Sequence, residues 1–279
     1  YYSRFKRKYI WYSFYFLRGD IMRCDKKIEE YDNLVKRILS CKLDCCGKIQ
    51  LSHCESCNEV NLWTYWEGGR DRLDADILVV GQDWGHIPDS ISVADVLKLG
   101  GPSRDLGYRD MFYDPRITTD ETLCTLFKNI KGCENVEHDY LHSGRICKNV
   151  FFTNYVCCYR KEKTSGGFDN KWMENCKKHF LDLVEIIEPK TIICLGRKAF
   201  DCVLTAAGEP KSQGCYNNTI LKGAVSMSIN DVTVQVYPMA HPGSMGTLNR
   251  CRSCDNDTKV ISRERGIELQ CNDWKKIKV

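Results

Sequence analysis

The chain has 279 residues, enough for one large α/β domain with additions or for two small domains. An apolar fraction of 43% and a charged fraction of 28% are ordinary for a globular protein and exclude wholesale disorder. The formal net charge of +4 excludes a histone-like polycation, and the apolar run at residues 10–17 is too short to span a bilayer.

Positive charge is concentrated in the N-terminal segment. Residues 1–48 hold twelve Lys or Arg and six Asp or Glu, which leaves a net charge of −2 for the rest of the chain. A basic, aromatic-rich arm of this kind suits phosphate binding, although many basic arms are only solvated faces. Apolar residues at helical spacing predict a helix over residues 20–40. We therefore expect residues 1–50 to form a basic helical extension and residues 51–279 to form the main domain.

Cysteine is unusually abundant, with eighteen residues. Such content in a short secreted chain would suggest disulfides, but no small-residue cleavage site follows the basic and apolar N-terminal stretch. Many cysteines fall inside predicted strands and helices, as in CLG and FTNYVCC. This distribution favours a reducing compartment, with some thiols buried and some bound to metal, and we expect a cytoplasmic protein.

Strands and helices alternate along the main domain. Apolar runs predict strands at 76–80, 150–154, 191–196 and 232–239. Helical periodicity predicts helices at 119–130, at 170–187 and from Arg197 onward. Alternation of this kind implies parallel βαβ units with helices on both faces. We therefore expect an α/β fold, in which three α/β/α layers surround a central four-stranded parallel sheet.

Polar residues lie at the carboxyl ends of three predicted strands. The stretch ILVVGQDWGH, residues 77–86, places Asp83 in a turn after a buried strand. VFFTN ends in Asn154, and AHPGSMG after the last strand carries His241. Each residue alone is more often structural, as a turn former, a helix cap or a loop histidine. Because ligands bind parallel sheets at the carboxyl ends of their strands, the three together predict one shared site.

Four separated motifs resemble, in order and spacing, those of the uracil-DNA glycosylase superfamily. They are ADILVVGQDWG, VFFTNYVCCYR, EIIEPKTIICLGRKAF and YPMAHPGSMGTLNR, and the resemblance covers roughly residues 50–275. It implies a uracil-DNA glycosylase-like α/β/α fold and a monofunctional DNA glycosylase that hydrolyses an N-glycosidic bond. DNA is then the expected partner of a monomeric protein that binds no membrane. GQDWG lacks GxGxxG spacing, so no nucleotide cofactor is expected.

The same resemblance implies roles for the residues at the strand ends. Asp83 would position water and stabilise positive charge on the sugar, as in sugar hydrolysis generally. His241 would donate a hydrogen bond to the base as negative charge builds there. The backbone around Gln82 would assist, and the Asn154 amide would bond the base edge at two points.

Further residues are expected to contact the DNA around the flipped base. Met245 lies where the family places an apolar wedge that fills the gap in the base stack, although a loop Met packed on the core is nearly as common. Ser244 and Arg250 are candidate DNA contacts, the latter to phosphate. The aromatic residue that stacks on the base is expected to be Phe112 or Tyr113.

Four cysteines match the iron–sulfur branch of the superfamily, which implies a 4Fe–4S cluster held by Cys54, Cys57, Cys158 and Cys176. A local zinc site is the alternative, with ligands drawn from Cys41, Cys45 or Cys46, Cys54 and Cys57. A second pair, Cys251 and Cys254, lies in an expected insertion near residues 250–265. Together with Cys271, this pair is a weaker candidate for a zinc site.

One residue of the first motif bears on which base is the substrate. In the strict uracil-excising branch, a tyrosine two residues after the motif aspartate blocks C5 of the base, and here that position is Gly85. An open C5 side favours bulky C5-modified pyrimidines, such as the glucosylated hydroxymethylcytosine of bacteriophages, and hence antiviral defence. Uracil repair is the alternative, because iron–sulfur relatives also have glycine there. A catalytically inactive module that binds modified DNA is the alternative of another class.

Overall fold

The fold is described from a computed structural model, which covers residues 25–38, 41, 72–82, 118–133, 149–157, 170–252 and 261–279. After a helix at residues 25–38, the elements follow in the order β1 (Ile77–Gly81), α4 (Thr118–Phe127), β2 (Val150–Asn154), α6 (Asn170–Ile187), β3 (Thr191–Leu195), α7 (Arg197–Ala206), α8 (Tyr216–Lys222), β4 (Val225–Ile229), β5 (Val232–Met239), α9 (Ser244–Cys251) and α10 (Arg263–Trp274). The predicted strands at 150–154 and 232–239 and the predicted helix at 170–187 have the observed bounds.

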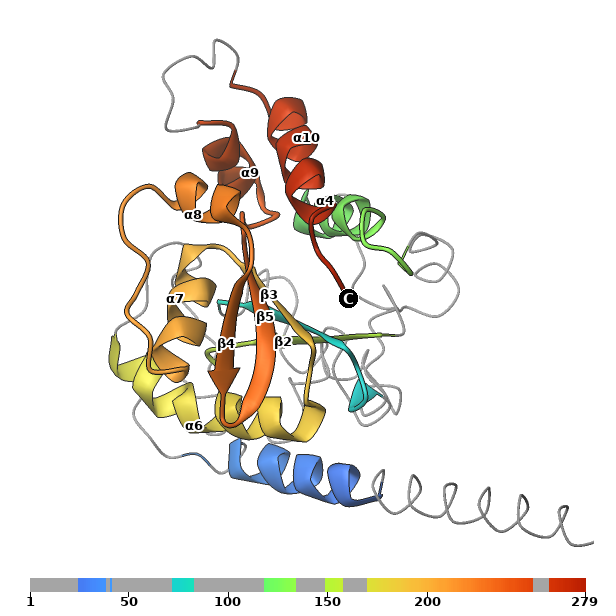
Figure 1. The fold of residues 1–279 in the computed structure, drawn as a ribbon, viewed down its shortest axis with the longest axis vertical. Helices are drawn as coiled ribbons and strands as arrows, with labels where there is room; N and C mark the ends of the chain where they lie inside the picture. The colour runs from blue at the N-terminus through green and yellow to red at the C-terminus, as the bar shows by residue number, and fades with distance from the viewer. Residues whose placement is uncertain are drawn as a thin grey trace, which may run out of the picture.

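The described sheet has five strands in the order β2-β1-β3-β5-β4 (Figure 1). The four predicted strands are parallel to one another, which confirms the α/β prediction. The fifth strand, β4, pairs antiparallel with β5 at the edge and was not predicted. Its sequence VSMSI is mostly exposed, so it lacks the apolar run of a buried strand. Asn230 and Asp231, both with positive φ, form the tight turn between β4 and β5.

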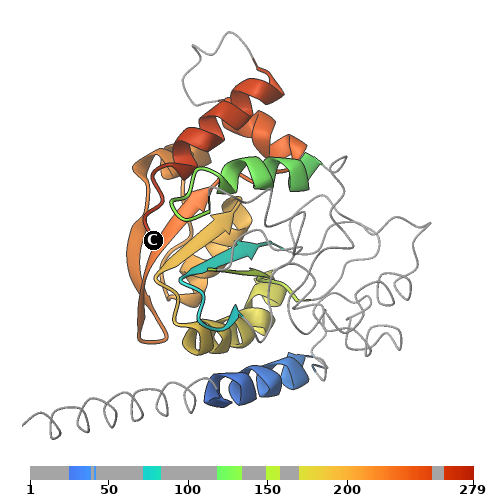
Figure 2. The same ribbon diagram turned by 90° about the vertical axis from the view of Figure 1, so that its right-hand side faces the viewer.

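Helices cover both faces of the sheet, because alternate strand residues point to opposite sides. Leu78 and Val80 of β1 belong to one buried cluster, which contains the apolar faces of α6 and α7. Ile77 and Val79 belong to a second cluster with residues of α4 and α10. Figures 1 and 2 show α6 and α7 on one side of the sheet and α4 and α10 toward the other. The predicted three-layer α/β/α arrangement is therefore confirmed.

The helix at residues 25–38 runs alongside α6 (Figure 2). Its apolar residues, among them Tyr31 and Leu34, are buried in the same cluster as α6. Lys27 is also buried, and its ammonium group donates to the carbonyl oxygen of Ile187 at the end of α6 and to Asp74. This part of the predicted basic extension is thus packed into the main core. The rest of the extension, and residues 253–260 of the predicted insertion, lie outside the described residues.

None of the helices described is long and apolar enough to cross a membrane.

Candidate active site

The carboxyl ends of the parallel strands lie side by side because the strands are paired in register. Gly81 at the end of β1 is opposite Asn154 at the end of β2. The pairing continues past the strands, since the N–H of Val156 donates to the carbonyl of Gln82 at 3.0 Å. On the other side, the N–H of Gly196 donates to the carbonyl of Met239 at 2.7 Å. The predicted meeting of the strand ends at one edge is therefore confirmed for the described residues.

An open cleft of about 910 Å³ lies at this edge. We call it the strand-end cleft, and it is lined by Gln82, Leu195, Gly196, Arg197, Lys198, Cys215, Tyr216, Asn217, Ala240, His241, Gly243, Ser244, Met245, Gly246, Asn249, Arg250 and Arg252. Four of these described lining residues are basic and none is acidic. The cleft lining is therefore basic in composition, which suits a nucleic-acid backbone, although Arg197 and Arg250 are ion-paired with Asp201 and Asp273.

His241 follows β5 and has its imidazole oriented by its own loop. The backbone N–H of Gly243 donates to Nδ1 of His241 at 3.0 Å. A nitrogen that accepts a hydrogen bond carries no proton, so this contact selects the neutral tautomer with the proton on Nε2. His241 is exposed at the surface of the cleft, but the protein atoms packed around it partly desolvate the imidazole, which lowers the pKa of His241 below its usual 6.5. His241 is thus a neutral imidazole that has an N–H left to donate.

Glycines allow the backbone to approach His241 closely. A Cβ atom added to Gly246 would lie 2.7 Å from the Cβ of His241, and one added to Gly243 would lie 3.0 Å from Nδ1. Gly196, which precedes α7, has a φ of 93° and would place a Cβ 3.5 Å from the same side chain. The glycines of AHPGSMG therefore serve a second purpose besides turning the chain: they let the loop close around the imidazole.

Asn154 is buried at the end of β2, with an exposed fraction of 3%. Within the described part of the chain, neither the nitrogen nor the oxygen of its side-chain amide has a hydrogen-bond partner. A buried amide left in this state is costly and is rare in proteins. The residue predicted to read the base edge is therefore unpartnered among the described residues, but it is buried behind the strand end and does not line the strand-end cleft.

The N-terminus of α9 borders the cleft with the two residues predicted to contact DNA there. Ser244 is exposed, and Met245 is 64% exposed, more than any other large apolar residue in the described segments. A single exposed apolar side chain is common on protein surfaces, and the informative feature of Met245 is its place at the rim of the cleft. This position fits the predicted wedge, and it rules out the alternative of a Met packed on the core.

The prediction of a phosphate contact for Arg250 is wrong. Its side chain is 4% exposed, and its guanidinium donates to both carboxylate oxygens of Asp273, at 2.7 and 3.1 Å. Asp273 belongs to α10, so the pair joins α9 to α10. This pair could not be predicted from a local pattern, because its two residues are 23 positions apart in the chain. A buried, paired arginine holds the fold and is not available for a phosphate.

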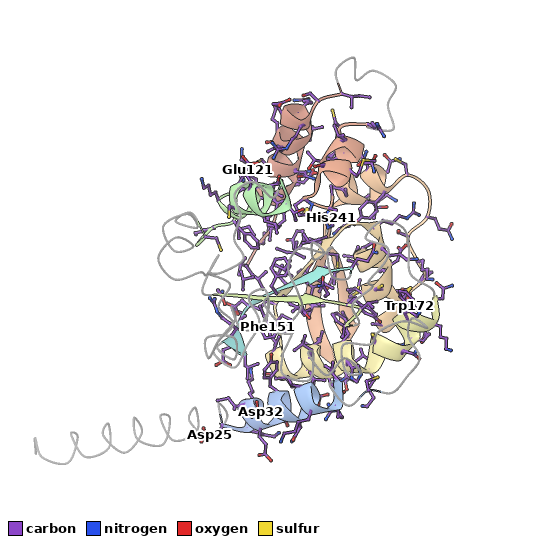
Figure 3. All side chains as sticks on the ribbon, turned by 180° about the vertical axis from the view of Figure 1, so that it is seen from behind. Asp25, Asp32, Glu121, Phe151, Trp172 and His241 are labelled. Atoms are coloured by element: carbon purple, nitrogen blue, oxygen red, sulfur yellow. The ribbon has the colours of Figure 1, made fainter. Side chains whose placement is uncertain are left out.

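Two residues near His241 were missed by sequence analysis. The hydroxyl of Thr119, in the first turn of α4, lies 3.2 Å from the position of a Cβ added to Gly243. Tyr216, in the first turn of α8, lines the cleft and donates from its hydroxyl to the carbonyl of Met239 at 3.3 Å. Both residues belong to helices that are far from the His241 loop in sequence, so no local pattern indicates that they lie near it. Figure 3 shows His241 where the sheet meets α4 and α9, far from Asp32 in the N-terminal helix.

Several predicted site residues lie outside the described residues: Asp83, Gly85, Phe112, Tyr113, Cys54, Cys57 and Cys158. Of the proposed cluster ligands, only Cys176 is described, and it is buried on α6 in the core. The described residues contain no group of three side chains that could hold a metal ion. The fit of a metal to the predicted four cysteines is therefore untested. Cys215 is disulfide-bonded, whereas Cys251 and Cys271 form no disulfide.

Comparison with known proteins agrees with the fold. Residues 71–261 match the family model described as the uracil DNA glycosylase superfamily. The match spans more than half of the chain, and the protein belongs to this superfamily. Membership suggests a DNA glycosylase, and hence a protein that binds DNA. A search of curated proteins finds no match.

Proposed function

We propose that this protein is a monofunctional DNA glycosylase that flips a pyrimidine nucleotide out of DNA and hydrolyses its N-glycosidic bond. The observation that carries the proposal is the state of His241, a neutral imidazole with Nδ1 occupied by Gly243 N–H and Nε2 left as a donor. It lies in a cleft with a basic lining at the strand ends, and the unpartnered amide of Asn154 lies at the same edge of the sheet.

The chemistry follows from where charge develops. As the bond between C1′ and the base nitrogen breaks, its electron pair leaves with the base, and positive charge develops on the sugar. A donor fixed beside a base oxygen stabilises the departing anion, and the Nε2–H of His241 supplies it. Water then adds to C1′, and the carboxylate of Asp83 orients this water and takes its proton. No lysine occupies the motif positions, so no Schiff base with the sugar is expected.

Recognition of the base is assigned to Asn154. Its amide offers both a donor and an acceptor, which match the hydrogen-bonding edge of a pyrimidine. A base that hydrogen-bonds with both the donor and the acceptor of this amide would remove the cost of leaving a buried amide unpaired. Such a base therefore binds more tightly than one whose edge does not match. Met245 at the rim of the cleft would enter the base stack behind the flipped nucleotide.

The test is an abasic-site assay on duplexes that carry single modified or mismatched bases. We expect His241→Leu to slow excision about 10²–10³-fold, the usual cost of losing one donor to a developing anion. Asp83→Asn should slow it by at least as much while DNA affinity is retained. His179→Leu is the matched control, because His179 is a partly buried histidine that does not line the cleft.

Wild-type protein that binds the DNA tightly but yields no abasic site on any substrate would overturn the enzymatic proposal. It would instead support the inactive DNA-binding module. Excision at the normal rate by His241→Leu would overturn the assignment of the donor while leaving the activity intact.

For the substrate, we propose C5-modified pyrimidines, of the glucosylated hydroxymethylcytosine type, in antiviral defence. The support is Gly85, which has no side chain to block C5, together with an amide reader that can pair with either a cytosine or a uracil edge. Parallel assays on uracil, thymine mismatches, hydroxymethylcytosine and its glucosylated form decide between this and uracil repair. Gly85→Tyr should abolish excision of the bulky bases and spare that of uracil. Efficient excision of uracil and of no other base would contradict the proposal.

For the cofactor, we propose a structural 4Fe–4S cluster on Cys54, Cys57, Cys158 and Cys176. The support is the spacing of the cysteines and their match to the iron–sulfur branch. Metal analysis of protein purified without oxygen should find iron and labile sulfide, and Cys176→Ser should reduce both. Zinc with no iron would favour the local zinc site. In that case Cys158→Ser should leave the zinc content of the protein unchanged.

A further inference from the structure

A buried glutamine from the C-terminal helix contacts the backbone of His241. Gln270 on α10 is 1% exposed, and its Nε2 donates to the carbonyl oxygen of His241 at 3.2 Å. Twenty-nine residues separate the two in sequence. The family match ends at residue 261, so α10 lies beyond the matched segment.

The helix that carries Gln270 is fixed to its neighbours at several points. Near its C-terminal end, Asp273 is paired with Arg250 of α9, and the ring of Trp274 packs edge-on against Phe127 of α4 with centroids 5.0 Å apart. Near its N-terminus, Gly266 lies so close to α9 that an added Cβ would be 2.3 Å from the carbonyl oxygen of Thr247. Gln270, between these points, therefore approaches His241 from a rigid support.

The carbonyl group of His241 has little room to move. Gly246 packs against it from α9, where an added Cβ would be 2.2 Å from the oxygen. Gln270 holds the same oxygen from α10. Rotation of this peptide group would also move the start of the segment from His241 to Gly243, whose two ends are joined by the hydrogen bond to Nδ1. The hydrogen bond from Gln270 to the His241 carbonyl and the hydrogen bond from Gly243 to the His241 imidazole are therefore coupled through the backbone of residues 241–243.

We propose that Gln270 is a positioning residue for His241: by holding the His241 carbonyl, it keeps Nδ1 on the Gly243 N–H and leaves Nε2 as the donor in the cleft. The role rests on the proposed function, in which this donor stabilises the departing base. Gln270 itself touches no substrate. Its removal should change the imidazole first and the reaction rate through it.

The experiment uses the full chain with histidine labelled by ¹⁵N, with the His241 signals assigned by loss in His241→Gln. Wild-type protein should show the Nε2–H tautomer, together with slow hydrogen exchange at the Gly243 amide. In Gln270→Met and Gln270→Leu, which remove the donor but keep an apolar side chain, we expect mixed tautomers and at least tenfold faster exchange at that amide. Single-turnover excision should fall about 10²-fold, with DNA affinity within about twofold.

Thr191→Val is the matched control. The Thr191 hydroxyl donates to the carbonyl of Lys278 at 2.9 Å, so this variant also removes a buried side-chain donor that holds the C-terminal segment. Thr191 does not contact His241 in any described interaction, and the control should leave the His241 signals and the excision rate unchanged. Stability loss alone would affect both kinds of variant equally.

His241 signals that match wild type in folded Gln270 variants would overturn the proposal. If neither variant folds, the wild-type protein decides: rapid exchange of the Gln270 side-chain amide protons would contradict the hydrogen bond on which the role depends. Wild-type protein without excision activity would overturn the proposed function, and the tautomer measurement would still show whether Gln270 orients His241.

Discussion

At the scale of the residue, the protonation state of His241 is set by its surroundings. A proton on Nδ1 would face the donating N–H of Gly243, and desolvation by the surrounding protein atoms lowers the pKa of His241 as well, although the residue is exposed in the cleft. His179 on α6 has a pKa that is lowered by burial too. Both histidines therefore stay neutral in the folded protein at a pH where they begin to bind protons in the unfolded chain.

This difference predicts the direction in which stability depends on pH. The unfolded chain protonates these histidines near the usual 6.5, and the folded protein does so only at lower pH. As the pH falls through this window, the unfolded state holds more protons, so the free energy of unfolding decreases. Urea denaturation across the window should show a decline that is smaller in His241→Gln and smallest when His179→Gln is added. A decline of the same size in all three proteins would contradict the assignment.

A second prediction at this scale concerns the exposed Met245. Met245→Ala should slow excision from duplex DNA and have much less effect on single-stranded DNA, because only a duplex requires the gap in the stack to be filled. Stability should be unchanged, since the side chain is 64% exposed. The control is Leu221→Ala, which removes a similarly exposed apolar side chain that does not line the cleft. Equal slowing on both forms of DNA would argue against a wedge.

At the scale of the element, α9 and α10 are joined by the buried pair Arg250–Asp273, whose side chains are 5% and 4% exposed. A buried ion pair is not strongly stabilising in itself, but loss of one partner leaves the other charge buried and unpaired. The pair thus makes the position of α9, and with it the His241 loop, depend on α10.

Asp273→Ala should lower the free energy of unfolding by about 3–5 kcal/mol, the usual cost of breaking a buried ion pair from one side. Replacing both charges, as in Arg250→Met with Asp273→Leu, should restore much of the loss. Equilibrium unfolding in urea measures both. Arg265→Ala is the control, because its pair with Glu268 is exposed to solvent and should contribute little to the free energy of unfolding. A loss for Asp273→Ala as small as that of the control would show that the pair is solvated.

At the scale of the whole molecule, the helix at residues 25–38 shares one core with α6 and the sheet. Tyr31 packs edge-on against Phe151 of β2, with ring centroids 6.0 Å apart, and Arg37 pairs with Asp182 of α6 at 2.7 Å. A segment buried in this way contributes to the stability of the sheet that carries the site.

Leu34→Ala should therefore destabilise the entire domain, by about 2–5 kcal/mol, because the fully buried side chain leaves a cavity. The unfolding transition should move as a whole when followed by circular dichroism and by tryptophan fluorescence. Lys36→Ala, in the same helix but exposed, should have little effect. An early, separate transition of the N-terminal helix in Leu34→Ala would instead show an independent extension.

The sequence by itself determined the local elements and the sheet edge at which Asn154 and His241 lie. Four strands, the helix at 170–187 and the convergence of Asn154 and His241 at one sheet edge followed from apolar periodicity and from the rules of parallel sheets. Each of these features depends on the pattern of apolar and polar residues within a short segment, and this pattern can be read from the sequence alone.

Only the tertiary structure decided how distant segments meet. It buried Arg250 against Asp273, added β4 to the sheet edge and brought Gln270 to the carbonyl of His241. Each outcome depends on a contact between residues whose approach no local pattern records, because side-chain packing selects the partner after the elements have formed. For that reason the fold class and the sheet edge that carries His241 were predictable from sequence, whereas the hydrogen bonds that hold His241 were not.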